Sequence, residues 1–152
     1  MKVTVFGMGY IGLPTAIALS LMGGHEVVGY DIDKDVIDTL KSGTIHINEP
    51  GLQELYSAVY GTDRFKVSAE IERSDVFIIC VPTPLKGHWW ELQADLNYVL
   101  RAACKVGGVL SNGNLVILES TVPPGTTENE FASVLKHSCR LNPQDPDQSF
   151  FI

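Results

Sequence analysis

The chain has 152 residues, of which 45% are hydrophobic, and its 11 basic and 18 acidic residues give a formal net charge of -7. This length suits a single domain with one well-covered core, and the acidic balance argues against nucleic acid as a partner. We recognise neither a signal peptide nor an apolar run long enough to cross a membrane, and we therefore expect a cytoplasmic protein with no membrane partner.

The first predicted element is an apolar strand over residues 2–6 that runs directly into a G-x-G-x-x-G motif. In such a motif Gly7 permits the tight turn that leaves the strand, and Gly9 has no side chain to hold a pyrophosphate away from the backbone. Gly12 allows the following helix to lie close to the strand, with its positive end toward the phosphates. A purely structural glycine turn is the alternative explanation for this spacing.

A helix is predicted over residues 10–22, and a second apolar strand over residues 26–30 leads to Asp31. A strand, a helix and an acid at this separation are typical of a dinucleotide-binding βαβ unit, and they favour that function over a structural turn. The carboxylate of Asp31 can accept hydrogen bonds from a ribose diol, and it repels a 2′-phosphate. The expected cofactor is therefore NAD rather than NADP.

Strands and helices continue to alternate along the chain. Further strands are predicted over residues 65–68, 75–81 and 115–119, and further helices over 34–42, 50–59, 95–110 and 126–138. Pro14 lies in a first helical turn, Asp33 and Asp95 are placed to cap helices, and Thr127 with Glu130 forms a capping box. This order predicts an α/β protein with a Rossmann-type, doubly wound parallel sheet in a single domain.

Two loops stiffened by proline, residues 81–84 and 119–127, follow predicted strands at the edge where an open α/β sheet binds its ligand. We expect both loops to border the nicotinamide half of the cofactor. Their candidate cofactor-binding residues are Val81, Thr83, Ser120 and Thr127, and Thr121 is a further candidate site residue. A hydroxyl that merely stabilises a turn is the alternative for Thr83 and Thr121, and a helix cap is the alternative for Thr127.

The cysteines Cys80, Cys104 and Cys139 are far apart in the sequence, and we expect them to be buried free thiols. The four histidines show no ligand spacing with one another or with the cysteines, so no metal site is predicted. No P-loop and no G-x-S-x-G nucleophile motif is present.

The last residues combine a predicted loop, 142–148, with an apolar segment, 149–152, that has the character of a strand start. We interpret this segment as the beginning of a sixth strand. On that interpretation residues 1–152 are the first domain of a longer enzyme.

Five motifs in order along the chain resemble the landmarks of the nucleotide-sugar 6-dehydrogenases. They are residues 7–16, 47–52, 81–84, 94–99 and 118–127. Within that family, Glu119 before the Ser-Thr pair and Lys86-Gly87 after the Thr-Pro pair resemble the UDP-N-acetylmannosamine dehydrogenases. The UDP-glucose dehydrogenases more often have a lysine before the Ser-Thr pair.

The resemblance implies oxidation of the C6 alcohol of a UDP-sugar to a carboxylate, with two NAD molecules as acceptors and a thiohemiacetal on a catalytic cysteine. It also implies that NAD is contacted by Tyr10, Ile11, Asp31, Thr83 and Thr127. Lys34 is expected to support Asp31 at the ribose, and Thr121 is expected to help position water near the reacting carbon. The full-length enzyme is expected to be a homo-oligomer.

Some family landmarks are absent from these 152 residues: the Pro-Glu-Arg segment, the catalytic lysine, the catalytic cysteine and the sugar-binding domain. None of the three cysteines matches the catalytic position, so this piece alone is predicted to be inactive. The segment 88–93, with two tryptophans, is longer than the usual loop and could form a domain contact.

We interpret the chain as the NAD-binding domain of a UDP-N-acetylmannosamine dehydrogenase. The alternatives are the same domain of a UDP-glucose dehydrogenase and a non-catalytic NAD-sensing module. A methyltransferase fits the glycine spacing less well.

Overall fold

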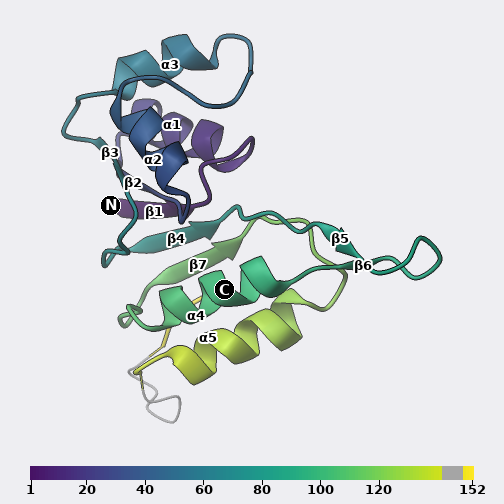
Figure 1. Ribbon diagram of the computed structural model, residues 1–152. Coiled ribbons are helices and arrows are strands. Elements are labelled where there is room, and N and C mark those ends of the chain that lie inside the picture. Colours follow the sequence, from purple (N-terminus) through teal and green to yellow (C-terminus); the bar gives the residue numbers. More distant parts are fainter. Residues whose placement is uncertain (142–148) are drawn as a thin grey trace.

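The computed structural model describes residues 1–141 and 149–152 (Figure 1). Its central sheet consists of β1 (Lys2–Phe6), β2 (Glu26–Tyr30), β3 (Phe65–Ser68), β4 (Val76–Ile79) and β7 (Leu115–Leu118). These strands are all parallel and lie in the order β3-β2-β1-β4-β7. The chain therefore adds strands outward from β1 in one direction and then in the other, as predicted for a doubly wound sheet.

Helices cover both faces of this sheet, as Figure 1 shows. They are α1 (Gly12–Leu21), α2 (Lys34–Lys41), α3 (Leu52–Val59), α4 (Asn97–Gly107) and α5 (Ala132–Ser138), with a π-helical turn, η1 (Thr127–Phe131), directly before α5. The first three pack on one face, and η1, α4 and α5 pack on the other. No helix in the described residues is long and apolar enough to span a membrane.

The central strands β1 and β4 are largely apolar on both faces because helices cover each face there. In β1, Val3 and Val5 belong to the hydrophobic cluster beneath α1 and α3, whereas Phe6 belongs to the cluster beneath α4 and α5. In β4 the same alternation places Ile78 in the first cluster and Phe77 in the second. This two-sided burial explains why the sequence shows continuous apolar runs at these strands.

One of the predicted helix caps is confirmed, and two are wrong. The side chain of Asp33 caps α2 by accepting a hydrogen bond from the backbone N–H of Asp35 at 2.9 Å. The N-cap of α4 is Leu96 rather than Asp95, which lies one residue earlier and accepts a hydrogen bond from the N–H of Asn97 at 3.1 Å. The predicted capping box of Thr127 with Glu130 does not form. The N–H of Phe131 bonds the carbonyl of Thr126, a five-residue span that places residue 127 inside a wide π-helical turn.

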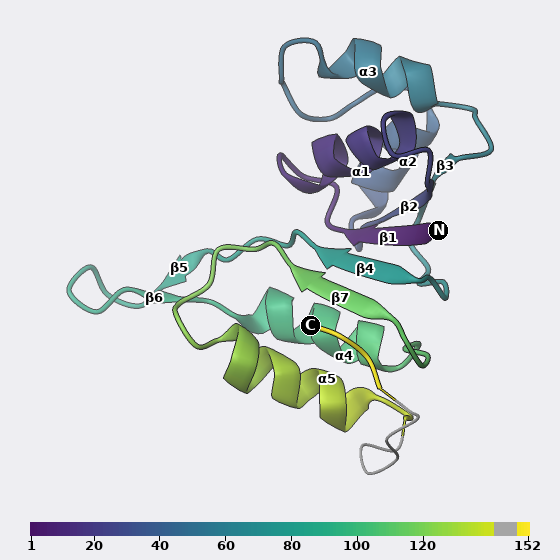
Figure 2. The same cartoon turned by 180° about the vertical axis from the view of Figure 1, so that it is seen from behind.

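A short antiparallel hairpin between β4 and α4 was not predicted. Its strands are β5 (Leu85–Lys86) and β6 (Gln93–Ala94), and it projects away from the sheet in both views (Figures 1 and 2). Trp89 at its tip is 82% exposed. Two-residue strands with exposed side chains have no apolar alternation from which they could be predicted.

The burial predicted for the cysteines is wrong for one of them. Cys104 is exposed because it lies on the outer side of α4, whose buried side is formed by Val99, Ala103 and Val106. Cys80 and Cys139 are half-buried, and all three cysteines are free thiols.

The last residues join the sheet beside β7. Phe151 forms a parallel bridge with Leu115, its N–H bonds the carbonyl of Asn114 at 2.9 Å, and its carbonyl accepts from Val116 at 2.8 Å. A sixth strand was predicted to begin in this segment. The loop predicted over residues 142–148 lies outside the described residues.

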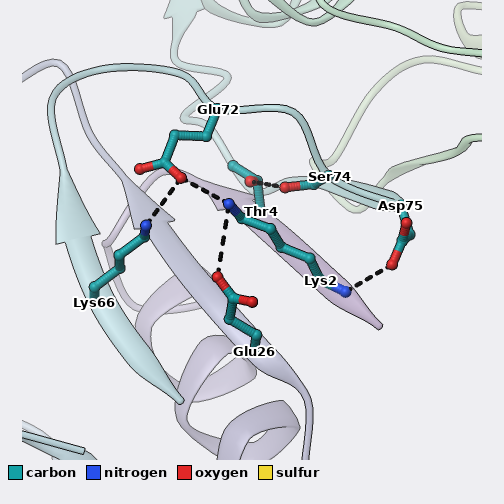
Figure 3. A network of polar contacts seen from close by, with 7 residues as sticks. All are labelled: Lys2, Thr4, Glu26, Lys66, Glu72, Ser74 and Asp75. Atoms are coloured by element: carbon teal, nitrogen blue, oxygen red, sulfur yellow. Dashed lines mark hydrogen bonds and ion pairs between the residues drawn. The ribbon is translucent and has the colours of Figure 1, made fainter. Parts of the chain in front are cut away.

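An ion-pair network joins the strands at their amino-terminal ends (Figure 3). The Nζ of Lys2 lies 2.7 Å from a carboxylate oxygen of Glu72, and the Nζ of Lys66 lies 2.9 Å from the same oxygen. Lys2 also pairs with Glu26 at 3.6 Å, and its backbone N–H bonds the carboxylate of Asp75 at 2.8 Å. The network ties the connection before β4 to β1, β2 and β3.

Candidate functional site

A pocket of about 890 Å³ lies at the opposite edge, where β2, β1, β4 and β7 end. The loops that follow these four strands line it, and residues of α4 close one side. This is the position at which a doubly wound sheet binds its ligand, because the strand order reverses there.

A different physical reason accounts for the glycine at each of the three motif positions. Gly7 has a φ of 88°, and a Cβ there would lie 2.5 Å from the carbonyl oxygen of Cys80. A Cβ on Gly12 would collide with the carbonyl oxygen of Gly7. The fold itself therefore requires these two glycines. A Cβ on Gly9 would meet nothing within 4 Å, so no described residue explains the glycine, and the free space faces the pocket.

Asp31 is fixed directly beside the glycine loop. One carboxylate oxygen accepts a hydrogen bond from the backbone N–H of Met8 at 2.8 Å, and the other accepts from Asp33 at 2.9 Å. A carboxylate has about four lone-pair positions, so these two bonds orient the group and leave acceptor capacity for a diol. The half-buried side chain lines the pocket at the end of β2.

Hydroxyl groups join the two loops that follow β4 and β7. The Oγ1 atoms of Thr83 and Thr121 lie 2.8 Å apart, and the Oγ of Ser120 donates to the carbonyl of Val81 at 2.8 Å. These bonds run between the loops rather than within one turn. They hold four predicted site residues together on the pocket wall.

A carboxylate and a thiol that were not predicted as site residues lie on the same wall. The Sγ of Cys80 donates a hydrogen bond to Glu119 at 3.2 Å, and both residues line the pocket. Burial, with a further contribution from this hydrogen bond, raises the pKa of the Cys80 thiol. The register pairs Ile79 with Leu118, so the residues that follow them lie opposite each other. Without that register the sequence offered no signal for the pair.

Residues of α4 contribute a cationic side to the pocket that was also missed. Tyr98, Arg101 and Lys105 line it, and the Nζ of Lys105 lies 5.7 Å from the centre of the Tyr30 ring. The three lie at a spacing of three to four residues, which puts them on one face of the helix. Basic residues at such positions resemble an ordinary solvated helix face, and only the packing of α4 against the sheet places them in the pocket.

The structure brings most of the predicted site residues together. Those lining the pocket are Gly7, Gly9, Tyr10, Ile11, Asp31, Val81, Thr83, Ser120 and Thr121. Three others are not among the lining residues. Gly12 is buried under the loop, Lys34 is exposed at the start of α2, and Thr127 is half-buried in η1.

The arrangement has the chemistry of a dinucleotide site. Across the sheet it offers an acceptor for a diol after β2, open space over a glycine backbone after β1, and hydroxyl groups after β4 and β7. A ribose, a pyrophosphate and a second nucleoside need these groups in this order. The residues present therefore fit the cofactor predicted from the sequence.

Residues 1–148 match the model of the UDP-glucose/GDP-mannose dehydrogenase family, NAD binding domain. The UDP-N-acetyl-D-mannosamine dehydrogenase of Pyrococcus horikoshii is 47% identical over 131 residues, which are 84% of this chain and 30% of that protein. The NDP-N-acetyl-D-galactosaminuronic acid dehydrogenase of Ralstonia nicotianae is 42% identical over 148 residues, which are 97% of this chain and 32% of that protein.

Among solved structures, the UDP-N-acetyl-mannosamine dehydrogenase of Staphylococcus aureus is similar, with a TM-score of 0.84 at 43% identity. The similarity covers 90% of this chain and 33% of that one. The chain thus spans about 30% of the length of the curated relatives that it matches.

Proposed function

Because this chain belongs to the UDP-glucose/GDP-mannose dehydrogenase family and matches its NAD binding domain, we propose that it is the cofactor-binding part of a UDP-N-acetylmannosamine 6-dehydrogenase. The names of two similar relatives, from P. horikoshii and S. aureus, support this choice of sugar. The full enzyme would oxidise the C6 alcohol of the sugar to a carboxylate.

In this proposal each part of the pocket binds one part of NAD. Asp31 accepts hydrogen bonds from the diol of the adenosine ribose, and the backbone at Gly9 receives the pyrophosphate. Thr83 and Thr121 face the nicotinamide half, and Thr121 also positions water near the reacting carbon. NAD supplies the acceptor for hydride, while the protein supplies binding and orientation.

The observation that carries the proposal is the free space at Gly9. Neither backbone conformation nor packing requires a glycine there, in contrast to Gly7 and Gly12. A bound group that approaches the backbone closely explains the glycine, because any side chain there would block the approach. The oriented carboxylate of Asp31, hydrogen-bonded to the neighbouring Met8 N–H, supports a nucleotide phosphate next to a ribose as that group.

We place the reactive cysteine, the catalytic lysine and the sugar pocket in the part of the enzyme beyond these residues. Cys80 is the pocket's own thiol, but its raised pKa keeps it protonated and makes it a poor nucleophile. In this proposal the chain holds the cofactor, and the nucleophile for the second oxidation comes from the rest of the enzyme.

The test is to follow NADH absorbance with NAD and a UDP-sugar. We expect no sustained NADH production from the 152-residue chain. We expect turnover from the protein extended to the length of its relatives, with UDP-N-acetylmannosamine preferred over UDP-glucose. Turnover by the chain alone would contradict the proposal that the catalytic cysteine and lysine lie outside these residues. A preference for UDP-glucose in the extended protein would overturn the choice of sugar.

A further inference from the structure

Glu119 places a carboxylate at the far end of the pocket from Asp31. It directly follows β7, while Asp31 directly follows β2, and β1 and β4 lie between these two strands. Three interstrand spacings separate the ends of β2 and β7 by about 14 Å across the sheet. Glu119 is therefore too far from Asp31 to share its task at a ribose.

Glu119 is exposed on the pocket wall, and no cation of the described residues forms an ion pair with its carboxylate. Its hydrogen-bond donor is the Cys80 thiol, a neutral group, at 3.2 Å, and the neighbouring side chains that line the wall are hydroxyls. Arg101 and Lys105 of α4 also line the pocket, but neither forms an ion pair with Glu119, and Lys105 lies over the ring of Tyr30 at the end of β2.

The order of groups across the sheet places Glu119 beside the nicotinamide. With the ribose at Asp31 after β2 and the pyrophosphate at the loop after β1, the rest of the cofactor extends over the ends of β4 and β7. The oxidised nicotinamide ring carries a positive charge, and reduction removes it. A fixed carboxylate nearby attracts the oxidised form and gives no such attraction to the reduced form.

We propose that Glu119 sets the preference of this site for NAD+ over NADH. The proposal rests on the proposed function, because it requires the dinucleotide to lie across the sheet as described. In an enzyme that oxidises an alcohol, such a carboxylate favours binding of the substrate form of the cofactor and release of the reduced product. Cys80 is a positioning residue in this account, because its thiol holds the carboxylate against the pocket wall.

The test is to titrate the 152-residue chain with NAD+ and with NADH by calorimetry and to compare the ratio of the two dissociation constants. The variants are Glu119→Gln, which removes the charge, and Glu119→Lys, which reverses it. Glu54→Gln is the matched control, because Glu54 lies on α3 and does not line the pocket. We expect Kd for NAD+ divided by Kd for NADH to rise about three- to tenfold in Glu119→Gln. It should rise further in Glu119→Lys and stay unchanged in Glu54→Gln.

A change that follows the charge of residue 119 cannot arise from a merely structural role. If the unchanged chain and the Glu119→Gln variant bind both forms with the same ratio, the role of Glu119 is overturned and the cofactor site is not. If the unchanged chain binds neither form, the proposed function fails, and the role of Glu119 fails with it. Thermal unfolding checks that each variant is folded. Should Glu119→Lys fail to fold, the comparison of the isosteric Glu119→Gln variant with the unchanged chain tests the proposal by itself.

Discussion

Asp31 combines a structural role with the role we propose at the ribose. Its two oxygens accept hydrogen bonds from the backbone of Met8 and Asp33, so the glycine loop and the start of α2 are held to the end of β2. The same bonds fix the direction in which the remaining lone pairs point. A ligand that binds there meets a carboxylate that needs no rearrangement.

We predict that the chain binds NADH more tightly than NADPH. A 2′-phosphate next to Asp31 brings two negative groups together, and the expected loss is about 1–3 kcal/mol of binding free energy. Lys34 is exposed and does not line the pocket, whereas Lys105 lies near Tyr30 and limits the penalty. Fluorescence titration with both cofactors measures the difference.

The variant Asp31→Asn should reduce the difference in affinity between NADH and NADPH, because it removes the negative charge that repels the 2′-phosphate. Asp63→Asn is the control, since Asp63 is exposed and does not line the pocket. Equal or tighter binding of NADPH by the unchanged chain would refute the assignment of Asp31 to the ribose.

At the scale of whole elements, the sequence predicted those helices and strands whose burial produces a regular spacing of apolar residues. Among the described residues, the five strands of the sheet and the five α-helices lie where apolar runs and helical periodicity indicated, except that α5 begins only at Ala132, after the π-helical turn. The hairpin β5–β6 was missed because three of its four strand residues are exposed and leave no apolar pattern. The π-helical turn was missed because Thr127 and Glu130 have capping-box spacing, and the local sequence does not reveal that Phe131 must reach the core.

The sequence predicted the residues of the candidate site only where they belong to one local motif. The glycine loop and Asp31 lie within a single βαβ unit, so their positions follow from spacing along the chain. The pair of Cys80 with Glu119 depends on the register of β4 against β7, and the place of Arg101 depends on how α4 packs. These are relations between distant elements, which a single sequence does not specify.

The ion-pair network at the amino-terminal edge should make stability depend on pH. Hydrogen bonds from Lys2 and Lys66 lower the pKa of Glu72 below its usual 4.5, and the bond to Glu72 raises the pKa of Lys2 above its usual 10.5. The contribution of Glu72 is therefore present above pH 4.5 and is lost as the pH falls through its lowered pKa. The contribution of Lys2 is complete below pH 10.5 and is lost as the pH rises through its raised pKa.

We predict that Glu72→Gln lowers the free energy of unfolding near neutral pH by at most about 1 kcal/mol per ion pair, because these side chains are partly exposed. Urea unfolding of the variant and of the unchanged chain should give the same free energy in strong acid. Glu70→Gln is the control, because Glu70 is exposed and its carboxylate has no ion pair among the described residues. A difference between Glu72→Gln and the unchanged chain that persists at low pH would contradict this account of the network.

For the molecule as a whole, the two edges of the sheet differ in what they contain. The ion pairs around Glu72 link the strands at the amino-terminal edge, and the pocket lies at the carboxyl-terminal edge. Helices bury the sheet on both faces, so the strand order alone determines which loops meet at the pocket. The pocket is therefore lined by loops from both halves of the sheet.

The most direct test of the cofactor site is the NADH affinity of the Gly9→Val variant. A side chain at Gly9 meets no protein atom within 4 Å of its Cβ, so the variant should unfold at nearly the same temperature as the unchanged chain. The same side chain fills the space assigned to the pyrophosphate, so NADH affinity should fall by at least about a hundredfold. Gly12→Ala provides the contrast: its Cβ collides with the Gly7 carbonyl oxygen, and it should lose about 2–4 kcal/mol of stability. Undiminished NADH binding by folded Gly9→Val protein would show that the phosphates lie elsewhere.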